Sequence, residues 1–375
     1  MQQRSPSRIN PHKKRDAGGT RHRLRSWAAK LPKIDLHRHL EGSLRLTTLI
    51  ELAEAHDIAL PTHDVAELRP YVQMAEELSD FTQFLEKFDV LRRFYISKTV
   101  IQRITREAIA DAALDNIIYL ELRFNPLALA RVHNFTFEEV VSWVIEAAAD
   151  AQAETGTRTC LILQIPRTES LEIAHEIVDL AIANSGPLVR GVDLAGDEVD
   201  GPPQRFAEPF GRAFEAGLHI TVHAGEWVGP ESVQAALEYL HPTRIGHGVR
   251  AIENSNVIKM LRRQQVALEV CPTSNLHTGV VRDLSKHPLV DLVNLGLRVT
   301  LNTDDPGISA ITLSHEYVVA VEQIGMPRTW IYQALRHAVD AAFIPDEERE
   351  PLRAKLAAQL APYPEAVATF EAAGL

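Results

Sequence analysis

The stretch IDLHRHLEGS, residues 34–43, combines a short strand with two histidines spaced two residues apart. Residues 34–36 are expected to form the strand, and because side chains alternate across it, His37 and His39 point the same way. Their backbones stand roughly 6.6 Å apart, so both imidazoles can turn onto one ion, and zinc accepts histidine nitrogen at about 2.1 Å. The motif also occurs on exposed strands, so by itself it leaves a metal site and a surface strand open.

Seven further strand-like runs follow, each separated from the next by enough residues for a helix. They lie at 117–124, 159–165, 189–196, 219–226, 244–248, 266–272 and 297–305. Apolar, β-rich runs separated by helices are typical of a parallel sheet that is covered on its outer face. Eight such units predict an α/β protein built as a (β/α)8 TIM barrel. Extra helices are expected after the first strand and from Thr312 to the C-terminus.

One helical segment after the first strand has a position that suggests a second role. FLEKFD, residues 84–89, carries Phe84 and Phe88 four residues apart, a spacing typical of a helix face that packs in the core. Because it follows the candidate metal strand so closely, this segment is also a candidate lid over a site.

Composition limits the possible partners and compartment. The 375 residues carry a formal net charge of -11, which disfavours binding to nucleic acid. No apolar run approaches the length of a membrane span. Cys160 and Cys271 are embedded in apolar runs, which predicts buried, reduced thiols and excludes a disulfide framework. We therefore expect a cytoplasmic protein with no nucleic-acid or membrane partner; its oligomeric state stays open.

The first thirty residues differ from the remainder. They hold nine Lys or Arg residues and one acid, Asp16, and lack the apolar region of a secretory signal. This composition predicts a disordered basic arm over residues 1–30, followed by a single domain over residues 31–375. A solvated tail or an upstream start codon is the favoured explanation, and a tether to nucleic acid or membrane is the alternative.

Polar residues gather where the predicted strands end. In a barrel these ends share one rim, which is where active sites lie. Three histidine nitrogens and one carboxylate at the rim provide a zinc shell with room for a bound water. Glu226 is not needed as a ligand, so it is free for proton transfer, and His247 can act on the zinc-bound water. The candidate ligands are His37, His39, His223 and Asp304. The histidines without such placement are assigned to the surface: His56, His63, His241, His287 and His315.

Each rim residue also has a purely structural interpretation. His223 suits a core histidine, Asp304 and Asp305 suit a turn before Pro306, and Glu226 suits a helix cap. The convergence of all of them on one rim favours a joint site.

Six motifs in order, HRHLEGS, LAGDE, HAGE, GHG, CPTSN and NTDDP, resemble those of the adenosine deaminase family of the amidohydrolase superfamily. The resemblance covers about residues 31–310. It implies one zinc ion per chain on the four candidate ligands, and a zinc-activated hydroxide that attacks C6 of a 6-aminopurine. It also implies a role for each remaining residue: Glu226 protonates N1, His247 orients the zinc water, Asp305 holds N7 and the water, the Gly196 backbone contacts N3, and His39, Glu41, Phe84 and Phe88 contact the substrate.

The implied reaction is hydrolytic deamination of adenosine and 2'-deoxyadenosine to inosine-type products and ammonia. Glu41 departs from the aspartate that adenosine deaminases often carry there, and resembles the acid of adenine deaminases and aminodeoxyfutalosine deaminases, which remain the alternative. The FLEKFD segment resembles the lid of nucleoside deaminases and favours adenosine.

Two other metal enzymes and a non-enzyme were weighed against this interpretation. A binuclear amidohydrolase needs a bridging lysine at the end of the fourth strand, and LAGDE has none. A cytidine-deaminase site needs H-x-E together with P-C-x-x-C, and this combination is absent. A binding protein on an inactive barrel is expected to lack a ligand or the acid, and none is missing.

Overall fold

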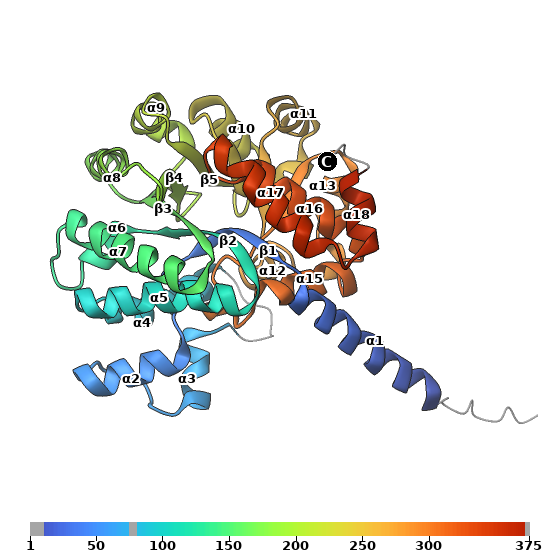
Figure 1. Cartoon of the computed structure of the whole chain (residues 1–375). Helices are drawn as coiled ribbons and strands as arrows, with labels where there is room; N and C mark the ends of the chain where they lie inside the picture. Colours follow the sequence, from blue (N-terminus) through green and yellow to red (C-terminus); the bar gives the residue numbers. More distant parts are fainter. Residues whose placement is uncertain (1–10, 75–80, 372–375) are drawn as a thin grey trace, which may run out of the picture.

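Eight parallel strands form the centre of the computed structural model, which describes residues 11–74 and 81–371 (Figure 1). The strands are hydrogen-bonded in the order of the chain, and β1 meets the segment after β8 through a parallel bridge between Arg38 and Asp304, so the sheet is nearly closed. The predicted (β/α)8 barrel is confirmed. The strands are β1 (Lys33–His39), β2 (Ile117–Phe124), β3 (Arg158–Pro166), β4 (Val189–Ala195), β5 (His219–Ala224), β6 (Arg244–His247), β7 (Ala267–Val270) and β8 (Arg298–Leu301).

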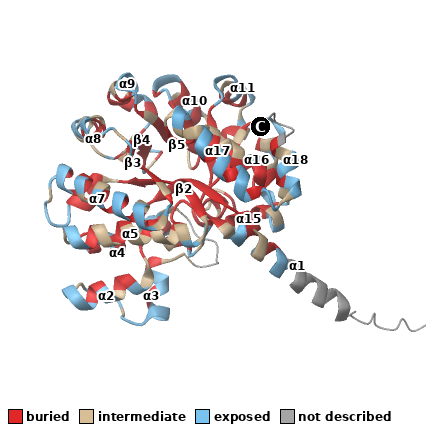
Figure 2. Ribbon diagram, in the orientation of Figure 1, coloured by how far each residue is buried: buried red, intermediate tan, exposed pale blue. Residues whose placement is uncertain are grey.

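Burial explains why these runs are apolar on both faces. Every residue of β1 and of β2 is buried, because one face fills the barrel and the other packs against helices (Figure 2). Local signals delimit the helices around them. The helix α7 begins at a capping box formed by Thr136 and Glu139, and ends at Gly156, whose φ of 73° lies in the left-handed region that glycine tolerates. The helices between successive strands are α5 (Lys98–Leu114), α6 (Pro126–Ala130), α7 (Phe137–Thr155), α8 (Leu171–Ala183), α9 (Ala207–Glu215), α10 (Pro230–Tyr239), α11 (Ser255–Gln264), α12 (Pro272–His277) and α13 (Leu289–Asn294).

The expected extra helices are present in both places. Between β1 and α5 the chain forms α2 (Leu46–His56), α3 (Val65–Val72) and α4 (Phe81–Leu91), and α3 packs against both of the others. The helices that follow β8 are α14 (Pro306–Ser309), α15 (Leu313–Glu322), α16 (Arg328–Ala341), α17 (Asp346–Leu360) and α18 (Pro364–Glu371).

The expectation of a disordered N-terminal arm is wrong for residues 21–30, which belong to helix α1 (Pro11–Lys30). Leu24 and Ala28, one helical turn apart, are buried, and α1 packs against α15 (Figure 1). Trp27 Nε1 donates to the hydroxyl of Tyr332 at 3.1 Å. The prediction rested on the basic composition of residues 1–30 and overlooked the apolar stripe formed by Leu24 and Ala28. Residues 1–10 lie outside the described part of the chain.

Cys160 and Cys271 are buried and form no disulfide, as expected. Within the described residues, no helix is long and apolar enough to cross a membrane.

Candidate active site

The strand ends and the loops after them surround a cavity of about 710 Å³, its open mouth included. Ten of the eleven residues singled out from the sequence line it, and the remaining one, His37, is fully buried beside them. The lining residues predicted from the sequence are His39, Glu41, Phe84, Phe88, Gly196, His223, Glu226, His247, Asp304 and Asp305.

Three separations among the four candidate ligands suit a metal shell, although neither set of mutually close ligand atoms found in the described residues contains all four. Nε2 of His37 and Nε2 of His39 each lie 3.2 Å from Oδ1 of Asp304, and the Nε2 atoms of His39 and His223 are 3.3 Å apart. Ligands placed tetrahedrally at zinc distances are about 3.4 Å from one another. Nε2 of His37 is buried without a hydrogen-bond partner, which fits a nitrogen that binds a metal.

A hydrogen bond at Nδ1 of each of the three histidines determines which ring nitrogen carries the proton. In all three histidines Nδ1 contacts a side-chain oxygen, which cannot donate when it belongs to a carboxylate or an amide carbonyl. The proton therefore sits on Nδ1 and leaves a lone pair on Nε2. The partners are Glu269 Oε2 at 2.6 Å from His37, Gln164 Oε1 at 3.0 Å from His39, and Asp193 Oδ1 at 3.0 Å from His223.

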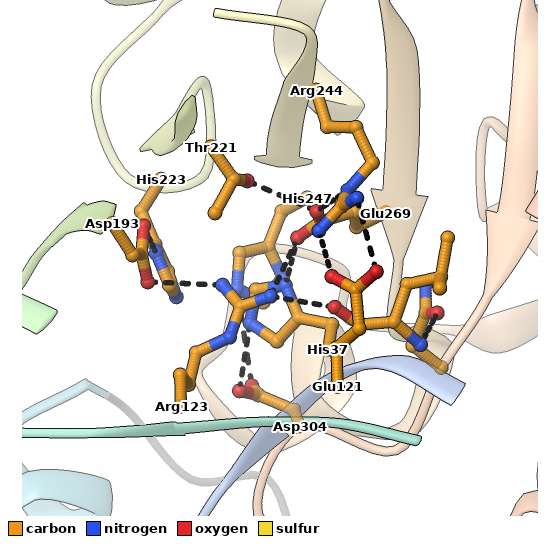
Figure 3. Close-up of polar contacts among 12 residues, drawn as sticks. His37, Glu121, Arg123, Asp193, Thr221, His223, Arg244, His247, Glu269 and Asp304 are labelled. Carbon is orange, nitrogen blue, oxygen red and sulfur yellow. Dashed lines mark hydrogen bonds and ion pairs between the residues drawn. The ribbon is translucent and has the colours of Figure 1, made fainter. Parts of the chain in front are cut away.

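Arg123 joins two of these acceptors inside the barrel (Figure 3). Its Nη1 lies 2.9 Å from Asp193 Oδ2 and its Nη2 lies 2.9 Å from Glu269 Oε2. Burial alone would raise the pKa of both carboxyls, but the pKa of Asp193 is lowered by His223 and Arg123, and that of Glu269 by Arg123 and Arg244. Both acceptors are therefore anionic under the histidines.

His247 is also close to the cluster, and spacing alone does not separate it from the ligands. A metal can be held within the set His37, His223, His247 and Asp304, or within the set His39, Asp304 and Asp305. Nε2 of His247 lies 3.5 Å from Glu226 Oε2 and 3.8 Å from Asp304 Oδ2. Its Nδ1, however, faces the amide nitrogen of Asn275 at 3.2 Å, where the three other histidines face oxygen.

Backbone strain marks the same place. His247 and Asp304 have φ values of 58° and 64°, in the left-handed region that residues with a side chain rarely adopt. Such conformations cost on the order of 1–3 kcal/mol each and concentrate at functional sites. His247 ends β6 and Asp304 lies three residues after the end of β8, and both residues line the cavity.

The surroundings of Glu226 favour the protonated form of its carboxyl. Its side chain is buried, and burial together with the charges of Asp304 and Glu198 raises its pKa well above the ordinary value. Thr278 Oγ1 donates to Oε1 of Glu226 at 3.2 Å and fixes its direction. A protonated carboxyl beside His247 is suited to donate a proton to a bound molecule.

Two other acids that line the cavity each have one unpaired oxygen. Glu41 accepts the backbone N–H of Asn125 on Oε1 at 2.6 Å, while its Oε2 is buried without a partner, and burial raises its pKa to about 7. Asp305 also has an unpartnered oxygen, Oδ1, and burial and the charge of Asp304 raise its pKa well above the ordinary value. Gly196 has a φ of 100°, which favours glycine at that position.

The aromatic segment supplies part of the cavity wall through Phe84, Leu85 and Phe88. Phe84 is buried and its ring contacts that of Phe88, with centroids 6.0 Å apart. Phe81, at the start of α4, packs on Trp227, which directly follows Glu226. The segment therefore contacts the loop that carries the acid.

No role was predicted from the sequence for the residues that support the ligands from the side away from the cavity. His287 is buried, so its assignment to the surface was wrong, whereas the other four histidines of that group are exposed. The sequence did contain a sign of the charged residues inside the barrel, because single charged residues interrupt strands that are otherwise apolar. The missed residues are Glu121, Arg123, Asp193, Glu198, Arg244, Glu269, Asn275 and His287.

The barrel and its histidine–aspartate cluster define a metal-dependent enzyme of the (β/α)8 class. The family model described as Adenosine deaminase matches residues 32–359. Curated adenosine deaminases of Shigella dysenteriae serotype 1 and Escherichia coli O1:K1 are each 39% identical to this chain over 88% of it and 98% of the relative. The chain belongs to the adenosine deaminase family.

Solved structures agree on the fold. An adenine deaminase from Arthrobacter aurescens is 29% identical with a TM-score of 0.81, covering 88% of this chain and 99% of its own. The N6-methyl-AMP deaminase from Arabidopsis thaliana is 31% identical with a TM-score of 0.78, covering 89% of this chain and 98% of its own. By their names, these two proteins act on adenine and on N6-methyl-AMP, respectively.

Proposed function

We propose that this chain is a zinc-dependent adenosine deaminase that hydrolyses adenosine and 2'-deoxyadenosine to inosine or 2'-deoxyinosine and ammonia. One observation carries the proposal: the buried carboxyl of Glu226, whose pKa is raised, lies beside His247 at the edge of a cluster of histidines and Asp304. The names of the relatives that are 39% identical support the same activity.

We assign one zinc ion per chain to His37, His39, His223 and Asp304, because three contacts among their nitrogens and the carboxylate oxygen, at 3.2–3.3 Å, suit a metal shell. When bound, zinc supplies Lewis acidity that lowers the pKa of water to about 7, so that hydroxide is available at neutral pH. Asp193, Gln164 and Glu269 keep the three rings in orientation through their Nδ1 atoms.

The remaining residues bind the purine and move protons. N1 and N7 of adenine are both acceptors, so each needs a donor from the protein. The carboxyls of Glu226 and Asp305, whose pKa values are both raised, suit N1 and N7, respectively, and the backbone of Gly196 suits N3. Protonation of N1 makes C6 more electrophilic, and ammonia then leaves as C6 becomes a carbonyl.

We propose a nucleoside as the substrate in preference to the free base. The unpartnered Oε2 of Glu41 is available to a ribose hydroxyl, and Phe84 and Phe88 add apolar wall to the same cavity. Adenine or aminodeoxyfutalosine is the second candidate, favoured by the longer acid at Glu41 and by the adenine deaminase among the similar structures.

We further propose residues 31–375 as one domain, a cytoplasmic location, and no nucleic-acid or membrane partner. The activity is tested by product analysis: the zinc-loaded protein is incubated with adenosine and the products are separated. Equal amounts of inosine and ammonia would support the proposal, and unchanged adenosine would overturn it.

A further inference from the structure

A buried chain of hydrogen bonds runs from the backbone of α13 to the ring of His247. The N–H of Leu289 lies 3.1 Å from His287 Nδ1. Nε2 of His287 lies 3.2 Å from Asn275 Oδ1, and Nδ2 of the same amide lies 3.2 Å from His247 Nδ1. The side chains of His287, Asn275 and His247 are all buried, so water does not compete for these contacts.

The direction of every bond in this chain follows from its first member. A backbone N–H can only donate, so Nδ1 of His287 accepts and its ring proton sits on Nε2. Nε2 then donates, so the atom of Asn275 that it faces is the carbonyl oxygen. The amide nitrogen of Asn275 therefore donates to Nδ1 of His247, and the proton of that ring sits on Nε2.

The side chain of Asn275 also lowers the pKa of the buried Glu226 carboxyl, against the larger effect of burial.

We propose that Asn275 and His287 are positioning residues that hold His247 as its Nε2–H tautomer. The inference rests on the proposed function, in which His247 faces the attacking water. It has two consequences. His247 presents a hydrogen-bond donor, not a lone pair, to the space between Glu226 and Asp304. A protonated Nε2 also cannot bind a metal, which removes His247 from the ligand set and leaves His39 as the third nitrogen.

The first test reads the tautomer directly and needs no substrate. Ring nitrogens of ¹⁵N-histidine-labelled, zinc-loaded protein are observed by NMR, and the His247 signals are assigned by their loss in His247→Asn. We expect an unprotonated Nδ1 and a protonated Nε2. A protonated Nδ1 on His247 would overturn the inference and leave the deaminase proposal standing. If the expected tautomer is found but no ammonia is released from adenosine, the deaminase proposal would be overturned and the tautomer inference would stand.

The second test uses a matched pair at His287, which touches neither the cluster nor the cavity. His287→Leu removes the donor to Asn275, and kcat is expected to fall by about 10- to 100-fold with little change in KM. His287→Gln places an amide N–H at the position of Nε2 and should recover most of that loss. Zinc content and thermal unfolding are measured for both variants. Equal kcat values in the two variants would contradict a positioning role, because general damage to the core affects both alike.

Discussion

Glu198 anchors the loop that carries Glu226. One oxygen of its carboxylate accepts the N–H of Gly225 at 2.5 Å. The other accepts the N–H groups of Glu226 at 3.2 Å, Trp227 at 2.8 Å and Val228 at 3.0 Å. Four backbone donors on one buried acid leave this loop little freedom. The proposed proton donor is therefore held at a set distance from His247 by a residue of the preceding strand–helix unit.

Replacing Glu198 by Gln is expected to loosen this loop, because the amide nitrogen of Gln cannot accept an N–H. We expect kcat to fall by about 10- to 100-fold, as for other residues that orient a site from behind. Steady-state kinetics with adenosine measures the effect. Glu215→Gln, an exposed change on α9, is the matched control. A Glu198→Gln enzyme with the same kcat as this control would show that the Glu198 carboxylate is dispensable for holding the loop.

Glu226→Gln keeps the size and much of the hydrogen bonding of the acid but has no proton to give to N1. Loss of general acid catalysis is expected to lower kcat by about 10²- to 10⁴-fold. Metal analysis of the same sample should give zinc content equal to the parent protein. A full rate would remove Glu226 from its proposed role.

The ligand assignment is tested by comparing His223→Ala with Asp193→Asn. The first removes a ligand and is expected to abolish stoichiometric zinc binding. The second keeps the ligand but replaces the charged acceptor of its Nδ1–H, and should weaken zinc binding by about 10- to 100-fold. Zinc retained after dialysis against a graded series of chelator concentrations measures both. A His223→Ala protein that stays fully loaded would break the assignment.

Glu41→Asp is expected to change the preference between nucleoside and base. The shorter acid keeps the charge but withdraws the oxygen that has no partner in the cavity. The ratio of kcat/KM for adenosine to kcat/KM for adenine measures the change. An unaltered ratio would mean that Glu41 does not contact the ribose.

Helix α1 is expected to contribute to stability without affecting catalysis. Leu24→Ala removes buried methyl groups from the contact between α1 and the barrel, and should cost about 2–3 kcal/mol of unfolding free energy. Denaturant unfolding measures the loss, and the rate with adenosine should stay that of the parent protein. Unchanged stability would indicate that α1 is not docked in solution.

The barrel was predictable because each of its strands is an apolar run of local sequence, and the predicted runs coincide closely with the observed strands. The rim residues were predictable because a parallel barrel brings all strand ends to one side. His287 and Asn275 were not, since they meet His247 only after α12 and α13 pack behind the site. Residues 21–30 were misjudged because their average composition is basic, whereas docking depends on the single stripe formed by Leu24 and Ala28.

Ammonia release from adenosine and from adenine, measured side by side with the zinc-loaded protein, tests the central claim most directly. We expect rapid release from adenosine and 2'-deoxyadenosine and a much smaller kcat/KM for adenine. Release from adenine alone would contradict a nucleoside deaminase and make Glu41 the residue that selects the base. Release from none of them, with zinc present at one ion per chain, would contradict the proposed substrate class.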